Sequence, residues 1–390
     1  MDAVEVGVPV DDAALTRGLQ DARMAASGTV VGGYTQIQAQ WLAVGAEHDI
    51  SGTASVRRLV LFVSHDFSGW GVPIRVYSEL EWENAVAGDG QPGSAEVEQA
   101  FLEWRLAGDL ASMRAGLVVL PMGIINQWHE PPVFNGVERP SFDQLLIPST
   151  WRELGVGFVG RPGPVRYELY ATTALDPRNF DDAGIVNGRT LGAVSPAEAV
   201  AFTGRVEVEP TLGLVVGGSG YASDTGPAGD WYDAVGDKLK LSLPVLGVSA
   251  DARWRGNGLE ARAVGAYWSL PESDDLMEAL KADGSPWFPE GAGAVPTRMI
   301  GGYVEAGVNV LWFSETTQEL VPFARLEHYD TQLGVPDGQT ANPLRTVDEG
   351  TFGLTYRPLA NVAFKADVQL RDRRYGDDEL GWNVGFGYMF

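Results

Sequence analysis

Apolar and polar residues alternate along most of this chain, most clearly at its end. Apolar or aromatic side chains occupy every even position from Leu380 to Phe390, and Gly, Asn and Met occupy the odd positions between them. A period of two indicates a β-strand with one apolar face and one face toward water. A soluble sheet gains little from ending on an exposed aromatic edge strand, whereas a closed barrel pairs its last strand with its first. A terminal strand of a soluble β-sandwich is the alternative.

The same alternation predicts about sixteen strands between residue 29 and the end of the chain. Sixteen is an even number, as single-chain bacterial barrels require, and it encloses an aqueous channel rather than a packed core. The strands are expected near residues 29–41, 54–65, 74–84, 96–106, 111–120, 152–160, 164–174, 199–209, 211–221, 245–255, 258–269, 298–313, 318–330, 347–357, 361–373 and 379–390.

The connections between these strands alternate between short and long. Short ones include 107–110, 161–164, 257–258 and 358–360, and long ones include 84–95, 121–151, 175–198, 222–244, 270–297 and 331–346. Short periplasmic turns and long extracellular loops are typical of membrane barrels. The sequence therefore predicts an all-β fold: a closed antiparallel transmembrane β-barrel over residues 29–390, with loop 121–151 folded inward, in the bacterial outer membrane.

Residues 1–28 form a separate N-terminal segment. Residues 11–26 are expected to make a short helix with acidic residues at its start, followed by a Ser-Gly stop. The segment could be periplasmic, plug the lumen or mediate oligomerisation. It lacks the basic start and apolar core of a signal peptide, so an exported protein would be numbered here from its mature chain.

Composition narrows the function classes. No run of 18 or more apolar residues is present, which excludes a transmembrane helix. The net charge of −24 argues against nucleic acid as a partner. Cysteine is absent, and only four of the 28 basic residues are lysines.

Aromatic residues near the strand ends are expected to face outward and form the interfacial girdles of the barrel. Such rings suit the boundary between lipid and water. We assign Trp41, Trp82, Trp104, Trp254, Trp268, Trp312, Trp382 and Tyr388 to these girdles. On the last strand, Phe386, Tyr388 and Phe390 together form the expected signal for the barrel assembly machinery.

Four short segments resemble the phosphate-selective porin O/P-like family. They are RAGLVVLPMG (114–123), PSTWRELGV (148–156), GGYVEAG (301–307) and YRPLANV (356–362). The resemblance implies a sixteen-stranded outer-membrane channel, usually a homotrimer, whose third loop folds into the lumen. The family's lumenal arginine ladder is accompanied by a lysine cluster, and lysine is nearly absent here, so phosphate selectivity does not follow from the resemblance.

Charged residues on the inward-facing positions are expected to line the pore. Acidic and basic side chains nearly balance on these positions, whereas loop acids such as Asp181 and Asp182 carry most of the net charge. Charge rings set ion selectivity in channels. The candidate constriction comprises Arg75, Glu79, Glu81, Glu103, Arg105, Arg205, Arg253 and Arg325 on the strands, with Glu138, Arg139, Asp143 and Arg152 in or beside loop 121–151.

Catalytic motifs are weak, and no cofactor or metal is expected. The four histidines are scattered, and the sequence contains no His-Glu-x-x-His, Walker or Gly-x-Ser-x-Gly motif. His328 lies at an outward-facing position without a partner that the sequence identifies. We therefore expect a passive porin for small hydrophilic solutes, surrounded by outer-membrane lipid and lipopolysaccharide. A phosphate-selective porin, a plugged surface barrel and an outer-membrane enzyme are the alternatives.

Overall fold

The computed structural model describes residues 28–390 apart from 46–48, 86–87, 89, 230, 233–237, 283–292 and 375. The N-terminal segment with its expected helix at 11–26 lies outside the described residues. None of the helices in the described part of the chain has both the length and the apolar character needed to cross a bilayer.

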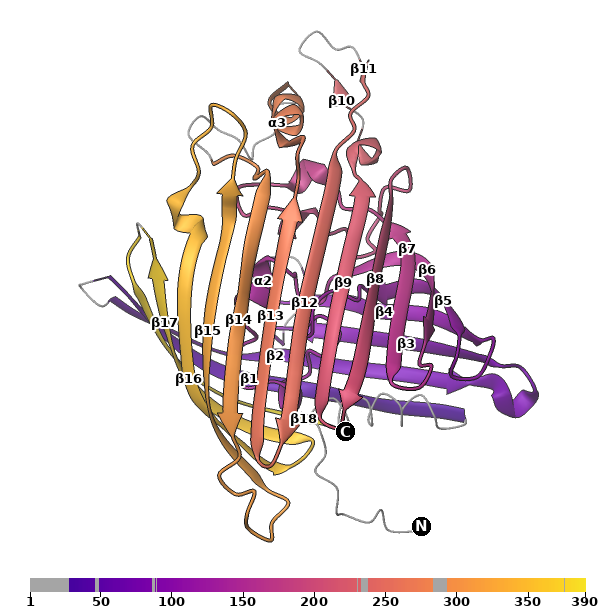
Figure 1. The fold of residues 1–390 in the computed structure, drawn as a ribbon, viewed down its shortest axis with the longest axis vertical. Helices are drawn as coiled ribbons and strands as arrows, with labels where there is room; N and C mark the ends of the chain where they lie inside the picture. Colours follow the sequence, from indigo (N-terminus) through magenta and orange to yellow (C-terminus); the bar gives the residue numbers. More distant parts are fainter. Residues whose placement is uncertain are drawn as a thin grey trace.

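In the described part of the chain, sixteen strands form one closed antiparallel barrel (Figure 1), as the sequence predicts. Each strand pairs with its sequence neighbours, and β1 pairs with β18 to close the ring. A separate two-stranded ribbon, β10 and β11, stands on the loop between β9 and β12. The barrel strands are β1 (Gly28–Val44), β2 (Asp49–Asp66), β3 (Ile74–Glu83), β4 (Ser94–Arg105), β5 (Ser112–Val119), β6 (Arg152–Gly160), β7 (Val165–Thr173), β8 (Val200–Thr211), β9 (Leu214–Asp224), β12 (Pro244–Gly256), β13 (Leu259–Ser269), β14 (Arg298–Val308), β15 (Glu319–Gly334), β16 (Thr346–Leu359), β17 (Val362–Arg373) and β18 (Glu379–Met389).

Short helical segments lie in the connections. Long loops and α3 project from one end of the barrel, and short turns and the C-terminus lie at the other end (Figure 1). These elements are η1 (Phe67–Trp70), η2 (Pro131–Val133), α2 (Phe142–Leu145), η3 (Pro177–Asn179), η4 (Val186–Gly188), η5 (Gly226–Ala228), α3 (Ser273–Ala282) and η6 (Pro343–Arg345), with β10 (Trp231–Tyr232) and β11 (Lys238–Leu239).

Several strand boundaries differ from the sequence prediction, and turns explain two of them. β14 ends at Val308, five residues early, where the Asn309 side chain accepts hydrogen bonds from the amides of Leu311 and Leu320 and so forms a turn. β9 starts at Leu214 instead of 211, because Gly213 adopts a left-handed φ of 81° in a tight turn.

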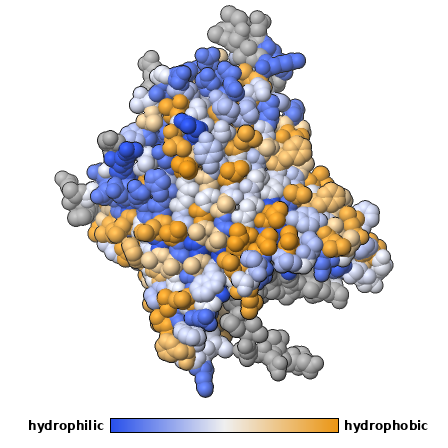
Figure 2. All heavy atoms as spheres, viewed as in Figure 1, coloured by the Kyte–Doolittle hydropathy of each residue, from blue (hydrophilic) through white to orange (hydrophobic). Residues whose placement is uncertain are grey.

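The outer wall of the barrel is apolar. Leu169, Phe202, Val304 and Leu326 are among the large hydrophobic residues exposed on it. Figure 2 shows hydrophobic side chains gathered across the strand wall and hydrophilic ones at the end with the long loops. An exposed apolar band of this kind suits contact with lipid.

One girdle assignment is wrong. Trp268 is fully buried inside the barrel, where its ring lies 5.9 Å from Trp151 and 5.7 Å from Tyr221. The outward positions of β13 belong to its odd-numbered residues, such as Ala263 and Tyr267. Tryptophan prefers interfaces, but the parity of the strand prevails over that preference here.

Candidate functional site

Loop 3, defined here as residues 121–151, lies inside the barrel and is almost entirely buried. Its apolar side packs against the inward faces of β9 and β12–β15 in one hydrophobic cluster that includes Trp128, Phe142 and Trp268. The Trp268 indole Nε1 donates a hydrogen bond of 2.8 Å to the carbonyl of Leu146 in loop 3. Side chains therefore fill this half of the lumen.

The polar side of loop 3 is hydrogen-bonded to the rest of the wall. The Ser141 hydroxyl donates to Glu349 (2.8 Å), and the Phe142 amide donates to Glu327 (3.0 Å). Near β1, the Gln36 amide donates to the carbonyl of Val137 (3.0 Å). These bonds tie the loop to β1, β15 and β16, which lie within one arc of the ring.

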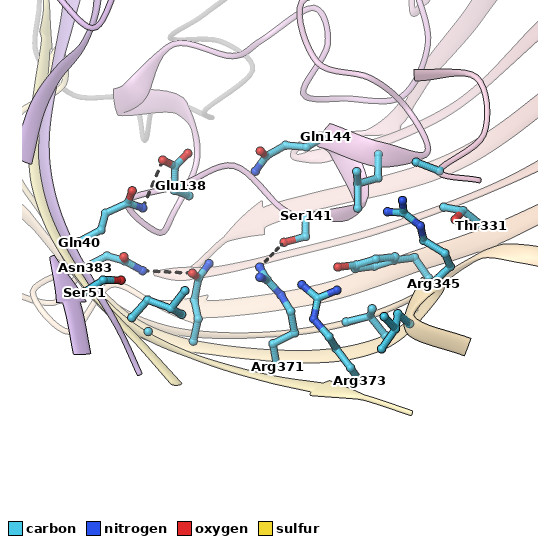
Figure 3. A pocket seen from close by; sticks show the side chains of 18 of the residues that line it. Gln40, Ser51, Glu138, Ser141, Gln144, Thr331, Arg345, Arg371, Arg373 and Asn383 are labelled. Carbon is cyan, nitrogen blue, oxygen red and sulfur yellow. Dashed lines mark hydrogen bonds between the residues drawn. The ribbon is translucent and has the colours of Figure 1, made fainter. Parts of the chain in front are cut away.

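A cavity of about 570 Å³ remains between loop 3 and the wall formed by β1, β2 and β15–β18. Amide and hydroxyl side chains form much of its lining, together with three arginines (Figure 3) and apolar residues such as Leu42 and Val347. The residues labelled in the figure are Gln40, Ser51, Glu138, Ser141, Gln144, Thr331, Arg345, Arg371, Arg373 and Asn383.

Each arginine of the cavity has a carboxylate partner. Arg371 pairs with Glu349 (2.8 Å) and Glu379 (2.7 Å), and Arg373 pairs with the same Glu379 (2.9 Å). Arg345 forms an ion pair with a loop acid, Asp182. The cavity wall is thus rich in hydrogen-bonding groups but nearly balanced in charge.

Glu138 is the only residue of the sequence-predicted constriction that lines this cavity in the described part of the chain. Its carboxylate accepts hydrogen bonds from Gln38 (2.5 Å) and Gln40 (3.3 Å) of β1. The rest of the lining lies outside the sequence prediction. The alternating glutamines of the first strand, of which Gln40 lines the cavity, are the signal in the sequence that points to it.

Most of the other predicted residues face the interior in three separate groups rather than one ring. In the first group, Arg75 and Arg105 both form ion pairs with Asp66, at 2.7 and 3.0 Å. Glu103 forms ion pairs with Arg75 (3.7 Å) and Arg114 (2.7 Å). These close pairs neutralise one another, so the group presents little net charge to the lumen.

The second group lies around the apolar side of loop 3. Arg205 and Arg253 both bind Glu207, at 2.9 and 2.8 Å, and Arg253 also stacks 3.8 Å from the centre of the Trp128 ring. Arg325 is fully buried between Glu305 (3.2 Å) and Glu327 (2.7 Å). Here Arg253 links loop 3 to the wall, whereas Arg205 and Arg325 pair with carboxylates of the wall itself.

The third group brings Glu79, Glu81 and Arg139 near two residues that the sequence analysis did not select, Glu98 and His129. Glu81 pairs with Arg58 (3.3 Å), and Arg139 donates to the carbonyl of His129 (3.2 Å). Burial, with Arg58 close by, lowers the pKa of Arg139 to about 10.

Asp143 and Arg152 lie apart from these groups. Asp143 is fully buried in loop 3, and this burial, reinforced by the charge of Glu327, raises the pKa of its carboxyl group. Arg152, the first residue of β6, forms an ion pair with Glu96 of β4.

His328, the candidate for an outer-wall enzyme, does have a partner. Its Nδ1 lies 2.8 Å from Asp348 Oδ1, and both side chains are exposed on the outer face. No serine or threonine hydroxyl bonds to this histidine among the described residues, so the pair lacks the nucleophile of a hydrolytic triad.

Comparison with known proteins places this architecture among outer-membrane barrels. No family model matches the chain. A protein of Aquifex aeolicus (strain VF5), described only as uncharacterized, is 29% identical over 367 residues, covering 93% of this chain and 80% of that protein.

Solved structures of porins share the fold at low sequence identity. Salmonella typhi OmpF, in complex with daunomycin, matches with a TM-score of 0.60 and 13% identity, over 93% of this chain and 97% of that one. Pseudomonas putida OprB matches with a TM-score of 0.57 and 10% identity over the full length of both chains. The Vibrio cholerae outer-membrane protein OmpT matches with a TM-score of 0.52 and 9% identity, over 94% and 99% of the two chains. The chain therefore has the fold of the bacterial outer-membrane porins.

Proposed function

We propose that this protein is a porin of the bacterial outer membrane through which small hydrophilic solutes and ions diffuse passively. The observation that carries the proposal is the lumenal cavity of about 570 Å³, with its lining of amides, hydroxyls and paired arginines. A wall of this kind can exchange hydrogen bonds with a passing solute or its water without holding a charged ion strongly.

The packing of loop 3 supports one route for the solute over the other. The apolar cluster around Trp128, Trp151 and Trp268 fills the side of the lumen next to β9 and β12–β15. Hydrophilic solutes would avoid this side because it offers them few hydrogen bonds. The route therefore follows the opposite wall, along β16–β18 and β1–β2, where the cavity lies.

Phosphate selectivity, the alternative named above, receives less support. Lys365 is the only lysine on a barrel strand in the described part of the chain, and it is buried, with its Nζ 3.7 Å from the centre of the Phe134 ring. The cavity arginines are already paired with carboxylates. A phosphate would have to displace these carboxylates before it could bind.

A plugged barrel is the second candidate, and one specific observation favours it. Beside the cavity, loop 3 bonds to the strands on either side of β18: the Val137 amide donates to Asp367 of β17 (2.5 Å), and Gln38 of β1 donates to Glu138 (2.5 Å). A solute that follows this wall must pass these bonds or displace them.

The proposal includes the surroundings of the protein. A bacterial outer membrane, with its lipid and lipopolysaccharide, matches the apolar outer wall, and the aromatic C-terminal strand suits recognition by the barrel assembly machinery. A homotrimer fits the same proposal, because one Vibrio cholerae OmpT structure with this fold is a trimer form.

Bilayer conductance and liposome swelling test the channel. Purified protein should produce stepwise conductance. In the swelling assay, small neutral sugars should enter faster than large ones. Ser51→Trp, which places a large ring in the cavity, should reduce both signals. Val63→Trp changes the outward face of the same strand and should leave them unchanged. A wild-type protein that inserts into bilayers without conductance would establish the plugged barrel instead.

A further inference from the structure

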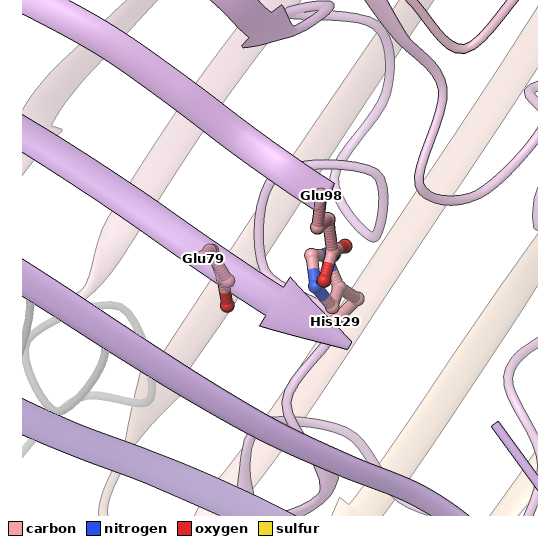
Figure 4. Close-up of side chains that lie close together, drawn as sticks. All are labelled: Glu79, Glu98 and His129. Atoms are coloured by element: carbon pink, nitrogen blue, oxygen red, sulfur yellow. Dashed lines mark ion pairs between the residues drawn. The ribbon is translucent and has the colours of Figure 1, made fainter. Parts of the chain in front are cut away.

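Three buried side chains meet where loop 3 touches β3 and β4 (Figure 4). They are Glu79 of β3, Glu98 of β4 and His129 of loop 3. One ligand-type atom from each residue lies within 4.8 Å of the other two. The exposed fractions of the residues are 5%, 0% and 3%, so bulk water hardly reaches them.

A β-bulge places Glu98 in this cluster. Glu79 pairs with Gln99 and the next residue, Leu80, pairs with Val97, so Glu98 is the extra residue in β4. Farther along β4, even-numbered residues such as Ala100 and Trp104 face outward, and without the bulge Glu98 would do so too. Bulges are common beside functional sites because they redirect one side chain.

His129 is oriented so that its Nε2 faces the carboxylates. Its Nδ1 lies 3.0 Å from the backbone carbonyl of Asn126, and a carbonyl can only accept, so Nδ1 carries a proton. The Asn126 side chain is itself bonded to the backbone of Leu120 (2.7 Å) and Trp151 (2.8 Å). Metal-bound histidines are commonly held in this way, with the second nitrogen donating to a carbonyl.

Glu98 is incompletely satisfied by its protein partners. Its Oε1 lies 2.8 Å from His129 Nε2, but its Oε2 has no hydrogen-bond donor among the described residues. Of the nearby guanidinium groups, Arg58 pairs with Glu81 (3.3 Å) and Glu83 (3.4 Å), and Arg139 donates to a backbone carbonyl. A buried carboxylate oxygen without a partner is costly, and a bound cation would remove that cost.

We propose that Glu79, Glu98 and His129 bind a divalent transition-metal cation such as Zn²⁺, which fastens loop 3 to the β3–β4 wall. One imidazole nitrogen with two carboxylates suits zinc and its neighbours, whereas Mg²⁺ and Ca²⁺ prefer oxygen ligands alone. A dication also balances two carboxylates in a site that excludes water. The proposal does not depend on an open channel, since the site lies outside the cavity described above.

Zinc content after refolding tests the site. Because the three residues are buried, the full chain is refolded into detergent with and without ZnCl₂, and excess metal is then removed by gel filtration in a weak chelator. Elemental analysis should find about one retained zinc per chain. His129→Gln and Glu98→Gln should each weaken zinc binding by at least about 100-fold. Refolding with MgCl₂ in place of ZnCl₂ should leave no retained metal.

The outer wall supplies a matched control. His328 and Asp348 are also a histidine and a carboxylate 2.8 Å apart, but they are exposed and have no third ligand among the described residues. His328→Gln should therefore retain zinc like the wild type. Equal zinc content in the wild type and His129→Gln, or loss of zinc in His328→Gln, would overturn the proposal and leave His129–Glu98 as an ion pair only.

A second measurement uses only the wild type, so it tests the site even if the variants fail to fold. Refolding of the wild type with Co²⁺ should produce visible absorption bands. Their intensity should indicate a low coordination number, as expected for cobalt bound to the histidine and the carboxylates, and added Zn²⁺ should abolish them. A spectrum identical to that of aqueous cobalt would contradict the site without the use of any variant.

Discussion

The last residue of the chain, Phe390, and Gly33 of β1 exchange two backbone hydrogen bonds. The Phe390 amide donates to the Gly33 carbonyl (3.0 Å), and the Gly33 amide donates to the Phe390 carbonyl (3.1 Å). The Phe390 side chain itself remains 62% exposed on the outer wall. The C-terminal residue therefore closes the seam through its backbone and leaves its ring free for lipid or a partner.

Deletion of Phe390 should reduce outer-membrane assembly far more than it destabilises protein that has already folded. The exposed ring contributes less than about 3 kcal/mol by burial, whereas the assembly machinery would read it during insertion. Membrane levels in cells should be compared with urea unfolding of refolded protein. Phe390→Ala keeps the backbone pairs and isolates the ring. Equal membrane levels of the deletion and the parent protein would refute this prediction.

Trp268→Ala should loosen loop 3 and widen the channel. The substitution removes the bond to the Leu146 carbonyl and the packing against Trp151 and Tyr221. Loss of a buried tryptophan typically costs about 3–5 kcal/mol. The unfolding free energy should fall by that order, and single-channel conductance should rise. Trp382→Ala, on the lipid-facing side of β18, should leave conductance unchanged; a rise there as well would contradict the role given to loop 3.

Asp182 connects the loop after β7 to the loop before β16, and its contribution to stability should depend on pH. Burial opposes ionisation, but hydrogen bonds from Arg345 and Asn342 prevail and lower the pKa of Asp182 below its usual range. A carboxyl group with a depressed folded pKa stabilises the protein above its unfolded pKa of about 3.9, and this stability is lost as the pH falls through the folded value.

Arg345→Gln should accordingly lower the thermal midpoint at pH 7 and lose most of this effect near pH 2. The pair is partly exposed, so its contribution should be about 1 kcal/mol or less. Thermal scans of both proteins at the two pH values provide the measurement. A difference that stays constant across this range would show that the arginine acts by packing alone.

Ion selectivity should be weak, with a mild preference for cations at low salt. The cavity arginines are neutralised by Glu349, Glu379 and Asp182, so the acidic residues of the loops dominate the field at the mouth. Reversal potentials across a salt gradient measure this preference. It should fade above about 0.1 M salt, where the Debye length is about 10 Å. A clear anion preference, blocked by micromolar phosphate, would restore the phosphate function.

Arg371→Gln should shift the reversal potential further toward cations. The substitution removes the positive charge that is paired with Glu349 and Glu379. Their negative charges then act more strongly on a passing ion, because the cavity is narrow. Arg374→Gln removes the same charge from an exposed position beyond the end of β17 and should have a smaller effect. Equal shifts in the two variants would show that the cavity does not control selectivity.

The sequence by itself determined the barrel. Alternation with a period of two is local, so it can be followed residue by residue, and it places Val76, Leu80 and Leu326 outside and Arg75, Glu79 and Arg325 inside without any knowledge of strand partners. The sequence also shows directly that short and long connections alternate and that the last strand is aromatic.

The tertiary structure alone decided which inward side chains meet. One bulge reverses the parity of β4 and brings Glu98 inside, and this shift depends on the register with β3 rather than on the local pattern. Glu138 reaches Gln38 across a hundred residues, and Trp268, which the parity of β13 already turns inward, meets the Leu146 carbonyl of loop 3. The cavity is the space that these long-range contacts leave unfilled, so no local pattern in the chain could locate it.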